Sequence, residues 1–374
     1  MKDRVLQVIP CLELGGTEAY VMNNYRHIDK EKIQFDFLVF AEKDYPYTKE
    51  IISLGGNIYY GVQPGLKNFF KFLKILKNVT QNGESYKAIH CHANTGNALP
   101  LFCATLCGIK NRISHCHAIC GSVSLVGRLK FFFRKTVIKL FATEYLACST
   151  EAGNSLYGKN LFINKGKVIN NAIDIDKFID IDEEKVERIR AEFKIDKNKI
   201  ILGNISRFDK YKNNTFVLEV FSDLLKINSE LLLVLGGVDG GMLETIKNRV
   251  KELNLQDKVI FIGPRDDVAD CLHLIDIYVF PSVSEGFGIS LLEAQAAGCL
   301  CFASTGVPNK TDMGIGLANY YPLQTGAKKW AENISVRLDE IPKVNTEIIK
   351  EAFKAKGFSI KENVKQLEGV YYGR

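Results

Sequence analysis

The sequence predicts an α/β protein with two doubly wound, Rossmann-like domains that face a central cleft. Strand-like apolar runs alternate with helical patterns from one end of the chain to the other, which is typical of parallel sheets with helices on both faces. An Asn/Gly/Asp-rich stretch at 163–178 interrupts the alternation and indicates a linker. The length of 374 residues is long for one hydrophobic core and comfortable for two domains.

The first half supplies one of the two predicted domains. Its strand-like runs lie at 4–10, 35–40, 58–62, 86–92, 111–118 and 144–149. Helical patterns between these runs lie at 15–28, 66–77 and 125–141. Ligands of open parallel sheets bind beyond the carboxyl ends of the strands, so we expect site residues in the loops that follow the strand-like runs.

The second half repeats the alternation after a polar helical pattern at 183–193. Its strand-like runs lie at 199–206, 231–238, 258–263, 277–282 and 298–304. The stretch 348–373 is helical in pattern. We therefore expect a first domain at 1–167, a second at 168–355, and a C-terminal helix at 356–374 that returns to the first domain.

Composition excludes several classes of protein. Apolar residues make up 46% and charged residues 25%, as in water-soluble globular proteins. Uninterrupted apolar runs stay far below the ~20 residues of a spanning helix. The N-terminus opens directly into a strand-like run, so we expect no signal peptide, a cytoplasmic location and reduced cysteines. The net charge of +6 is modest, and we expect no nucleic-acid partner.

Two segments of the first half concentrate positive charge. Residues 66–77 carry four lysines and residues 125–141 carry five basic residues, both without an acid. One interpretation is two core-packing helices with solvated faces. The other is a basic, aromatic-edged surface for anionic lipid headgroups, and this second interpretation predicts an anionic membrane surface as a partner.

Two loops carry residues that suit phosphate groups. Gly15 and Gly16 follow the first strand-like run, where paired glycines allow close backbone approach to a ligand. Arg207 and Lys212 follow the strand that ends near Ser206. The guanidinium of arginine can donate hydrogen bonds to two phosphate oxygens at once, and lysine adds a positive charge on a flexible side chain. Either loop alone could be an ordinary turn.

The stretch EGFGISLLEAQAAG at 285–298 combines a helix start with two carboxylates. Its small Gly286 and Gly288 let the backbone run close to a ligand. The helix that follows presents unpaired N–H groups, which attract phosphate. Glu293 lies more than one turn further along among apolar neighbours, where it can accept hydrogen bonds from two ribose hydroxyls. The spacing from Glu285 to Glu293 therefore suits a nucleotide.

Four of the six histidines lie in two matching HCH pieces at 90–92 and 115–117. Histidine and cysteine this close allow a zinc interpretation. However, the period of two in a strand puts both histidines of a piece on one face and the cysteine on the other. There is also no C-x2-C spacing, so we favour a site without metal.

Together these stretches resemble the family-4 retaining glycosyltransferases of GT-B fold, particularly bacterial capsule and exopolysaccharide enzymes. Residues 285–293 resemble the E-x7-E signature of that family, and 205–213 resemble its Arg…Lys diphosphate pair. Residues 13–18 resemble its N-terminal Gly-Gly loop, and 168–178 its interdomain linker. The resemblance covers nearly the whole chain, with Ala172 where the family usually has glycine.

The resemblance implies where a nucleotide-sugar donor binds. Arg207 and Lys212 would hold the diphosphate, with help from the backbone of Gly15 and Gly16. The loop at 263–268, which includes Arg265, would lie near the base. The second domain would thus bind the donor and the first domain the acceptor.

The resemblance also implies the residues nearest the reaction. Glu285 and His117 would contact the donor sugar, and Glu293 would hold the ribose hydroxyls. The helix tip would supply further donor contacts from Gly286, Phe287, Gly288, Ile289 and Ser290. In this family the leaving phosphate itself can take the acceptor proton, so Glu285 is expected to orient the sugar rather than attack it.

The function expected from the sequence is sugar transfer from a UDP-sugar to a lipid-linked saccharide in capsule, exopolysaccharide or O-antigen synthesis. The enzyme would act without metal or cofactor, on the inner face of the plasma membrane. A GT-B epimerase acting on free nucleotide sugar is the main alternative. A dehydrogenase would need a G-x-G-x-x-G turn, which the chain lacks. A protein that only binds a ligand would have little need for the four charged residues together, namely Arg207, Lys212, Glu285 and Glu293.

Overall fold

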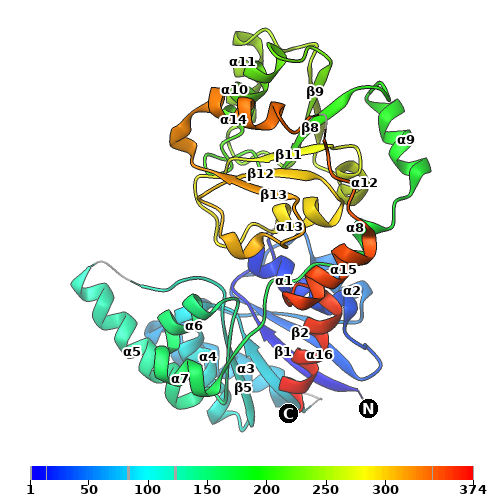
Figure 1. Cartoon of the computed structure of the whole chain (residues 1–374). Helices are drawn as coiled ribbons and strands as arrows, with labels where there is room; N and C mark the ends of the chain where they lie inside the picture. The colour runs from blue at the N-terminus through cyan, green and yellow to red at the C-terminus, as the bar shows by residue number, and fades with distance from the viewer. Residues whose placement is uncertain (1, 14, 82–84, 122–123, 339, 374) are drawn as a thin grey trace. The chain divides into compact units, whose positions relative to one another are not determined.

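The computed structural model describes residues 2–13, 15–81, 85–121, 124–338 and 340–373 (Figure 1). The chain divides into two compact units. The first combines Met1–Ala172 with Ile360–Arg374, and the second is Ile173–Ser359. Each unit is built on its own parallel sheet, which confirms the predicted class of two doubly wound, Rossmann-like domains.

The first unit contains a seven-stranded parallel sheet in the order β3-β2-β1-β4-β5-β6-β7. The strand order reverses between β1 and β4, and such switch points are where open α/β sheets bind ligands. The strands are β1 (Asp3–Val8), β2 (Ile33–Val39), β3 (Ile58–Tyr60), β4 (Tyr86–Cys91), β5 (Asn111–Cys116), β6 (Glu144–Ala147) and β7 (Gly166–Val168).

Helices cover both faces of this first sheet (Figure 1). Successive side chains of a strand point to opposite faces, so Val5 packs in the cluster under α1 and α16, and Leu6 in the cluster under α3 and α4. The helices are α1 (Gly16–His27), α2 (Thr48–Ser53), α3 (Phe69–Gln81), α4 (Ala98–Leu106), α5 (Leu125–Phe141), α6 (Thr150–Tyr157), α7 (Lys159–Lys165) and α16 (Ile360–Tyr371), with short 3-10 turns η1 (Leu66–Asn68) and η2 (Asn94–Asn97).

The second unit contains a six-stranded parallel sheet in the order β10-β9-β8-β11-β12-β13, which reverses between β8 and β11. The strands are β8 (Ile200–Ile205), β9 (Leu231–Gly236), β10 (Val259–Gly263), β11 (Ile277–Phe280), β12 (Leu300–Ser304) and β13 (Ala318–Tyr321). The helices are α8 (Ile175–Ile179), α9 (Glu183–Glu192), α10 (Asn214–Leu225), α11 (Leu243–Glu252), α12 (Val268–Leu272), α13 (Ile289–Ala296), α14 (Ala327–Ser335) and α15 (Thr346–Ala355), with turns η3 (Asn309–Thr311) and η4 (Leu323–Thr325).

The predicted linker at 163–178 is largely regular structure. It contains the end of α7, the edge strand β7 and the short helix α8. The sequence did not predict these elements, because the segment is polar. Its strand β7 lies at the edge of the sheet, where Lys167 and Val168 remain exposed.

The unit boundaries also differ from the predicted boundaries at 167/168 and 355/356. Ile169 and Ala172 are buried in the core of the first unit, whereas Ile173 and Phe358 are buried in the core of the second. The divisions therefore fall after Ala172 and after Ser359, because burial rather than composition decides where each unit ends.

Candidate functional site

The carboxyl edge of the second sheet brings two predicted loops together. β8 and β11 are neighbours at the switch point, so the loops that follow them leave the sheet side by side. The backbone N–H of Val283 donates to the carbonyl of Tyr211 across these loops, with 2.8 Å between N and O. The residues predicted at 207–212 and at 285–293 therefore belong to one site in this unit.

Lys212 and Glu285 form an ion pair at the centre of this site. The distance from Lys212 Nζ to Glu285 Oε1 is 2.6 Å, and the two side chains are only 19% and 14% exposed. The ammonium also lies 4.8 Å from the ring centroid of Phe280. This ion pair fixes one positive and one negative group beside the start of α13.

Arg207 is exposed on the same loop, and its position depends on glycines that the sequence analysis did not select. A Cβ on Gly240 would come within 3.0 Å of Arg207 Cγ and Cδ, and one on Gly237 would come within 1.9 Å of the carbonyl oxygen of Ser206. The GGVDGG run at 236–241, which begins at the last residue of β9, was the available signal. Its glycines let the loop after β9 pack against the loop that carries Arg207.

Helix α13 begins where the sequence predicted. Gly288 is its N-cap at φ 93°, a backbone conformation that favours glycine. The N–H groups of Ile289 and Ser290 lie in the first turn, where helical N–H groups lack intrahelical acceptors and attract anions. Gly286 is exposed, with nothing within 4 Å of a Cβ built there, so this approach to the helix tip is open.

Phe287 has a structural contact that the sequence did not indicate. Its side chain is buried in the core of the second unit, with its ring centroid 5.3 Å from that of Phe358. The large aromatic ring buries more apolar surface in the core than it could on the loop. Phe287 therefore anchors the loop between its two glycines, and only its backbone remains for a ligand.

Glu293 lies on α13 in a partly buried position. Burial raises the pKa of its carboxyl to about 7, although the positive charges of Lys177 and Lys212 act in the opposite direction. Because burial disfavours the ionised form of this carboxyl, hydrogen bonds from hydroxyl groups of a ligand would stabilise it. Lys177, on α8, is a further charged neighbour that the sequence analysis did not select.

The raised pKa of Glu293 makes a prediction about stability and pH. A carboxyl whose pKa is higher in the folded state than its ordinary 4.5 stabilises the protein at low pH, and this stabilisation is lost as pH rises towards 7. Relative to Glu293→Gln, the wild-type Tm should therefore fall by a few degrees between pH 5 and pH 8. Glu244→Gln, at an exposed glutamate of α11, is the control, and a parallel pH dependence of wild type and Glu293→Gln would contradict the prediction.

Arg265, which the resemblance places near the base, is held by two acidic side chains of the second unit. Its Nε and Nη2 donate to the two carboxylate oxygens of Asp267, and its Nη1 donates to both oxygens of Glu192. These acidic partners satisfy the guanidinium, which also lies 5.6 Å from the ring centroid of Phe193. Arg265 thus ties the loop at 263–268 to α9.

The glycine pair of the first unit lies at its own switch point, between β1 and α1. A Cβ on Gly15 would lie 2.3 Å from Glu18 Oε2, whereas nothing lies within 4 Å of one on Gly16. Glu18, in the first turn of α1, also accepts a hydrogen bond from the Cys11 thiol at 3.2 Å. Gly15 therefore leaves room for this acidic side chain beside the start of the helix.

The histidines of the two HCH pieces gather at the carboxyl ends of β4 and β5. His90 Nε2 lies 3.1 Å from His115 Nδ1, and His92 Nδ1 lies 2.8 Å from His117 Nε2. Cys91 and Cys116 pack in the cluster on the opposite face of the sheet, which confirms the predicted alternation. Burial lowers the pKa of all four imidazoles, that of His117 to about 3, so they are neutral at pH 7.

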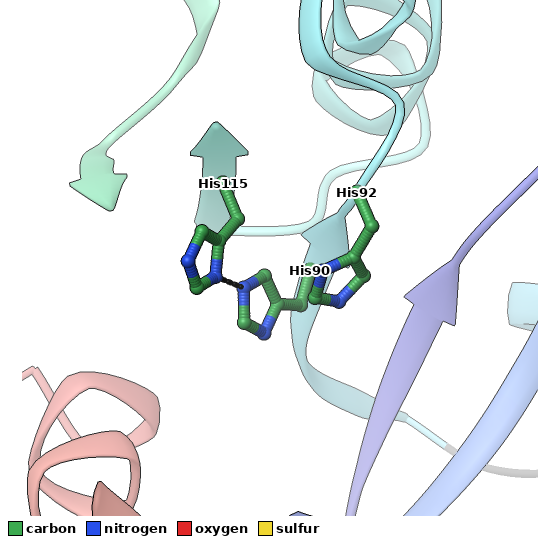
Figure 2. Close-up of side chains that lie close together, drawn as sticks. All are labelled: His90, His92 and His115. Atoms are coloured by element: carbon green, nitrogen blue, oxygen red, sulfur yellow. Dashed lines mark hydrogen bonds between the residues drawn. The ribbon is translucent and has the colours of Figure 1, made fainter. Parts of the chain in front are cut away.

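Three of these histidines are close enough to be considered as metal ligands. One nitrogen from each of His90, His92 and His115 lies within 4.8 Å of the other two (Figure 2). Zinc–nitrogen bonds are about 2.0–2.1 Å long and need free lone pairs that converge on the ion. Here the nitrogens of His90 and His115 face one another in a hydrogen bond, so metal binding would require these rings to turn apart.

Helix α5 exposes several large apolar side chains. Of its 17 residues, only Ile138 is fully buried. Phe132 is 68% exposed and Phe133 is 62% exposed, because consecutive side chains of a helix point in different directions and cannot all face the core. The other large exposed apolar side chains of α5 are Leu125, Val126, Leu129 and Leu140. None of the helices in the described part of the chain combines the length and apolar character that crossing a bilayer requires.

Comparison with known proteins gives a consistent family likeness. Residues 185–315 match the family model described as glycosyl transferases group 1. The chain is 32% identical over 377 residues to the putative glycosyltransferase EpsF of Bacillus subtilis (strain 168), which covers 99% of this chain and 96% of the relative. It is 25% identical over 340 residues to the capsular polysaccharide biosynthesis glycosyltransferase CapH of Staphylococcus aureus, covering 88% and 89%.

A solved structure shares the fold over the whole length. Anabaena Alr3699/HepE, crystallised in complex with UDP, superposes with a TM-score of 0.79 at 15% identity and covers 100% of both chains. At this identity the likeness concerns the fold, which is thus a GT-B fold with two Rossmann-like domains.

Proposed function

The chain belongs to the group 1 glycosyl transferases and is therefore a glycosyltransferase; we propose that it transfers a sugar from a UDP-sugar, with retention of configuration, to a lipid-linked saccharide. The observation that carries this proposal is the group formed by Arg207, the Lys212–Glu285 ion pair and the first turn of α13 at the switch point of the second sheet. Such an arrangement suits a diphosphate and the sugar attached to it.

Stabilising the leaving diphosphate is the main task of the proposed reaction. As the sugar–phosphate bond breaks, negative charge develops on the departing oxygen. Preorganised donors are most effective where such charge develops. The N–H groups of Ile289 and Ser290, the ammonium of Lys212 and the guanidinium of Arg207 would supply them.

Glu285 would orient groups rather than attack the sugar. Its Oε1 lies 2.6 Å from the Lys212 ammonium, and a carboxylate oxygen engaged in such a pair is a weaker nucleophile. Glu285 would keep Lys212 directed at the diphosphate and use its remaining oxygen for a sugar hydroxyl. The proton of the acceptor hydroxyl would then pass to the leaving phosphate on the same face.

Glu293 would bind the ribose. Two neighbouring ribose hydroxyls could donate to its carboxylate and compensate for the burial that raises its pKa to about 7. UDP is the first nucleotide to test, because the structural relative HepE was crystallised with it. The pKa also predicts that UDP binding weakens below pH 7, where Glu293 becomes protonated.

His117 would contact a hydroxyl of the transferred sugar from the first unit, as the family resemblance suggests. Its imidazole is neutral at pH 7 because burial holds its pKa at about 3. A neutral ring adds no positive charge that would compete with the diphosphate site, and it can accept a hydrogen bond at its unprotonated nitrogen.

The exposed surface of α5 supports a lipid-linked acceptor. Its phenylalanines and leucines are accompanied by exposed Arg128, Lys130, Arg134 and Lys139. A basic helix with exposed aromatic side chains suits an anionic bilayer surface. We propose that the enzyme acts peripherally on the inner face of the plasma membrane. Capsule, exopolysaccharide or O-antigen synthesis is the proposed process, which the name of the relative CapH supports.

The proposal is tested with a panel of nucleotide sugars. The true donor should raise the Tm of the protein, since a ligand that binds only the folded state stabilises it. Release of nucleoside diphosphate from that donor should then require a membrane extract that supplies the acceptor. Conversion of the free nucleotide sugar to its epimer without extract would instead support the alternative, a GT-B epimerase.

We also predict that activity does not depend on a metal ion. Lys212, Arg207 and the α13 N-terminus would supply the positive charge that a bound cation supplies in metal-dependent transferases. Saturating EDTA should therefore change the turnover less than twofold. Loss of turnover with EDTA, recovered on adding zinc, would contradict this prediction and point to the histidines of β4 and β5.

A further inference from the structure

The four histidines of β4 and β5 form two hydrogen-bonded pairs that lie against one another. Figure 2 shows the bond between His90 and His115, with the ring of His92 beside them. The centroids of His90 and His92 are 4.1 Å apart, as are those of His115 and His117. Such closely packed neutral rings need a definite pattern of ring protons, because within each pair one ring must donate an N–H and the other must accept it at a bare nitrogen.

Gln7, on β1, joins both pairs through its side-chain amide. Its Oε1 lies 2.8 Å from His92 Nε2, and its Nε2 donates to the hydroxyl of Tyr371 at 3.3 Å. That hydroxyl lies 3.0 Å from His90 Nδ1. Gln7 is 1% exposed, so one buried amide is shared by two hydrogen-bonded chains.

The first chain runs from the amide oxygen to His117. A carbonyl oxygen only accepts hydrogen bonds, so His92 carries its proton on Nε2. The neutral ring of His92 then has a bare Nδ1, which accepts from His117 Nε2–H. His117 Nδ1 is consequently unprotonated.

The second chain runs from the amide nitrogen to His115. The amide N–H donates to the Tyr371 oxygen, so the Tyr371 hydroxyl is free to donate to His90 Nδ1. His90 then carries its proton on Nε2 and donates it to His115 Nδ1, which leaves the His115 proton on Nε2. All four histidines are therefore Nε2–H tautomers.

The two chains end on groups of opposite character. His117 ends its chain with a bare nitrogen acceptor, and His115 ends the other with an N–H donor. Both end atoms are buried and without a hydrogen-bond partner among the described residues. A 180° turn of the Gln7 amide would reverse every bond, making all four rings Nδ1–H tautomers and exchanging the two ends.

We propose that Gln7 is a positioning residue that sets the tautomer of His117, so that the Nδ1 of this histidine, which is buried without a partner in the described part of this structure, is kept bare to accept a hydrogen bond from a substrate hydroxyl. Its amide couples the two chains, so the orientation of this one amide decides the tautomer of all four rings. The part concerning substrate rests on the proposed function, in which His117 contacts a hydroxyl of the transferred sugar. The part concerning the protons does not.

The proton arrangement is tested by long-range ¹H–¹⁵N spectra of protein labelled at histidine. His90, His92, His115 and His117 should all show the Nε2–H pattern at pH 7. His27 serves for comparison, because its Nδ1 lies 2.8 Å from the carbonyl oxygen of Asn23 and should therefore carry a proton. An Nδ1–H pattern at His117, a mixture among the four rings, or a metal ion retained on them would overturn the proposal.

The positioning role is tested with Gln7→Met, which keeps the shape but removes the amide. This variant should show mixed tautomers at His92 and His117 and a 10–100-fold lower kcat, with UDP affinity changed less than twofold. Gln7→Glu keeps an acceptor for His92 Nε2–H, so it should recover the Nε2–H pattern at His117 and part of the turnover.

Gln34→Met is the matched control for the loss of a buried amide. Gln34 lies on β2 of the same sheet, is 5% exposed and bonds to Tyr25 and the carbonyl of Leu54. It should lose stability without changing the histidine tautomers or kcat. A normal kcat in Gln7→Met, together with mixed tautomers, would overturn the positioning role. If the wild type turned over no nucleotide sugar at all, the proposed function would be overturned, and the spectra would remain as the test of the histidine network.

Discussion

Replacing Lys212 or Arg207 by alanine should lower kcat by on the order of 10²–10³-fold, equivalent to about 2–4 kcal/mol of lost transition-state stabilisation. Both side chains lie on the loop after β8, where Lys212 is paired with Glu285. Positive charge at this position matters most when the diphosphate departs, so kcat should fall more than donor affinity. Steady-state kinetics with the identified donor measures both.

Lys210→Ala is the matched control for this prediction. Lys210 lies on the same loop, is exposed, and has its ammonium 5.1 Å from the ring centroid of Tyr211. Its removal makes the same change in net charge at almost the same place, yet should leave kcat within about twofold. Equal losses for Lys210 and Lys212 would indicate a general effect of charge, and near-normal kcat in Lys212→Ala would refute the diphosphate site.

A double-mutant cycle separates the role of Glu285 from that of Lys212. If Glu285 acts by directing the ammonium, Glu285→Gln should cost little once Lys212→Met has removed that ammonium. If it also contacts the sugar, the double variant should be clearly slower than Lys212→Met alone. Residues in direct contact commonly show such non-additivity, so the cycle reports on the 2.6 Å pair itself.

The sequence predicted features that depend on local pattern. The start of α13 followed from Gly288 and the apolar spacing behind it, and the structure has its N-cap at that glycine. The two faces of the HCH strands followed from their period of two. The doubly wound class followed from the alternation of strands and helices, because each element must bury its apolar face against the next.

Features that depend on long-range pairing were not predictable in the same way. Lys212 and Glu285 meet only because β8 and β11 are neighbours in the sheet. Arg265 is engaged by Glu192, which lies 73 positions earlier in the chain. Gln7 meets Tyr371 across nearly the whole sequence. Sequence spacing cannot reveal which distant acid or amide will reach a given side chain.

Reversing charge on α5 should release the enzyme from anionic vesicles. Each basic residue near an anionic surface contributes about 1 kcal/mol, so Lys130→Glu/Arg134→Glu should lower the bound fraction at least tenfold at low salt. Both residues are exposed. Lys135 is a poorer choice, because its ammonium donates to the carbonyl of Ser155 at 3.1 Å and its reversal would disturb α5 itself.

The double variant Phe132→Ser/Phe133→Ser measures how much the apolar side chains of α5 contribute to vesicle binding, separately from its basic residues. These side chains are 68% and 62% exposed, so their removal should cost the fold little while removing the groups that would enter the headgroup region. Binding of this variant should weaken at every salt concentration, whereas the charge-reversed variant should differ from wild type mainly at low salt. The distinction follows because salt screens charge but not apolar burial.

Co-sedimentation with vesicles of anionic and of neutral lipid measures both contributions. Wild type should bind anionic vesicles at low salt, detach at high salt, and bind neutral vesicles weakly. Lys251→Glu/Lys328→Glu, two exposed positions of the second unit, makes the same change in net charge and should bind as wild type does. UDP binding should be unchanged in all three variants. Binding that ignores lipid charge, or none at all, would make α5 an ordinary solvated helix and would favour an acceptor that is free in solution.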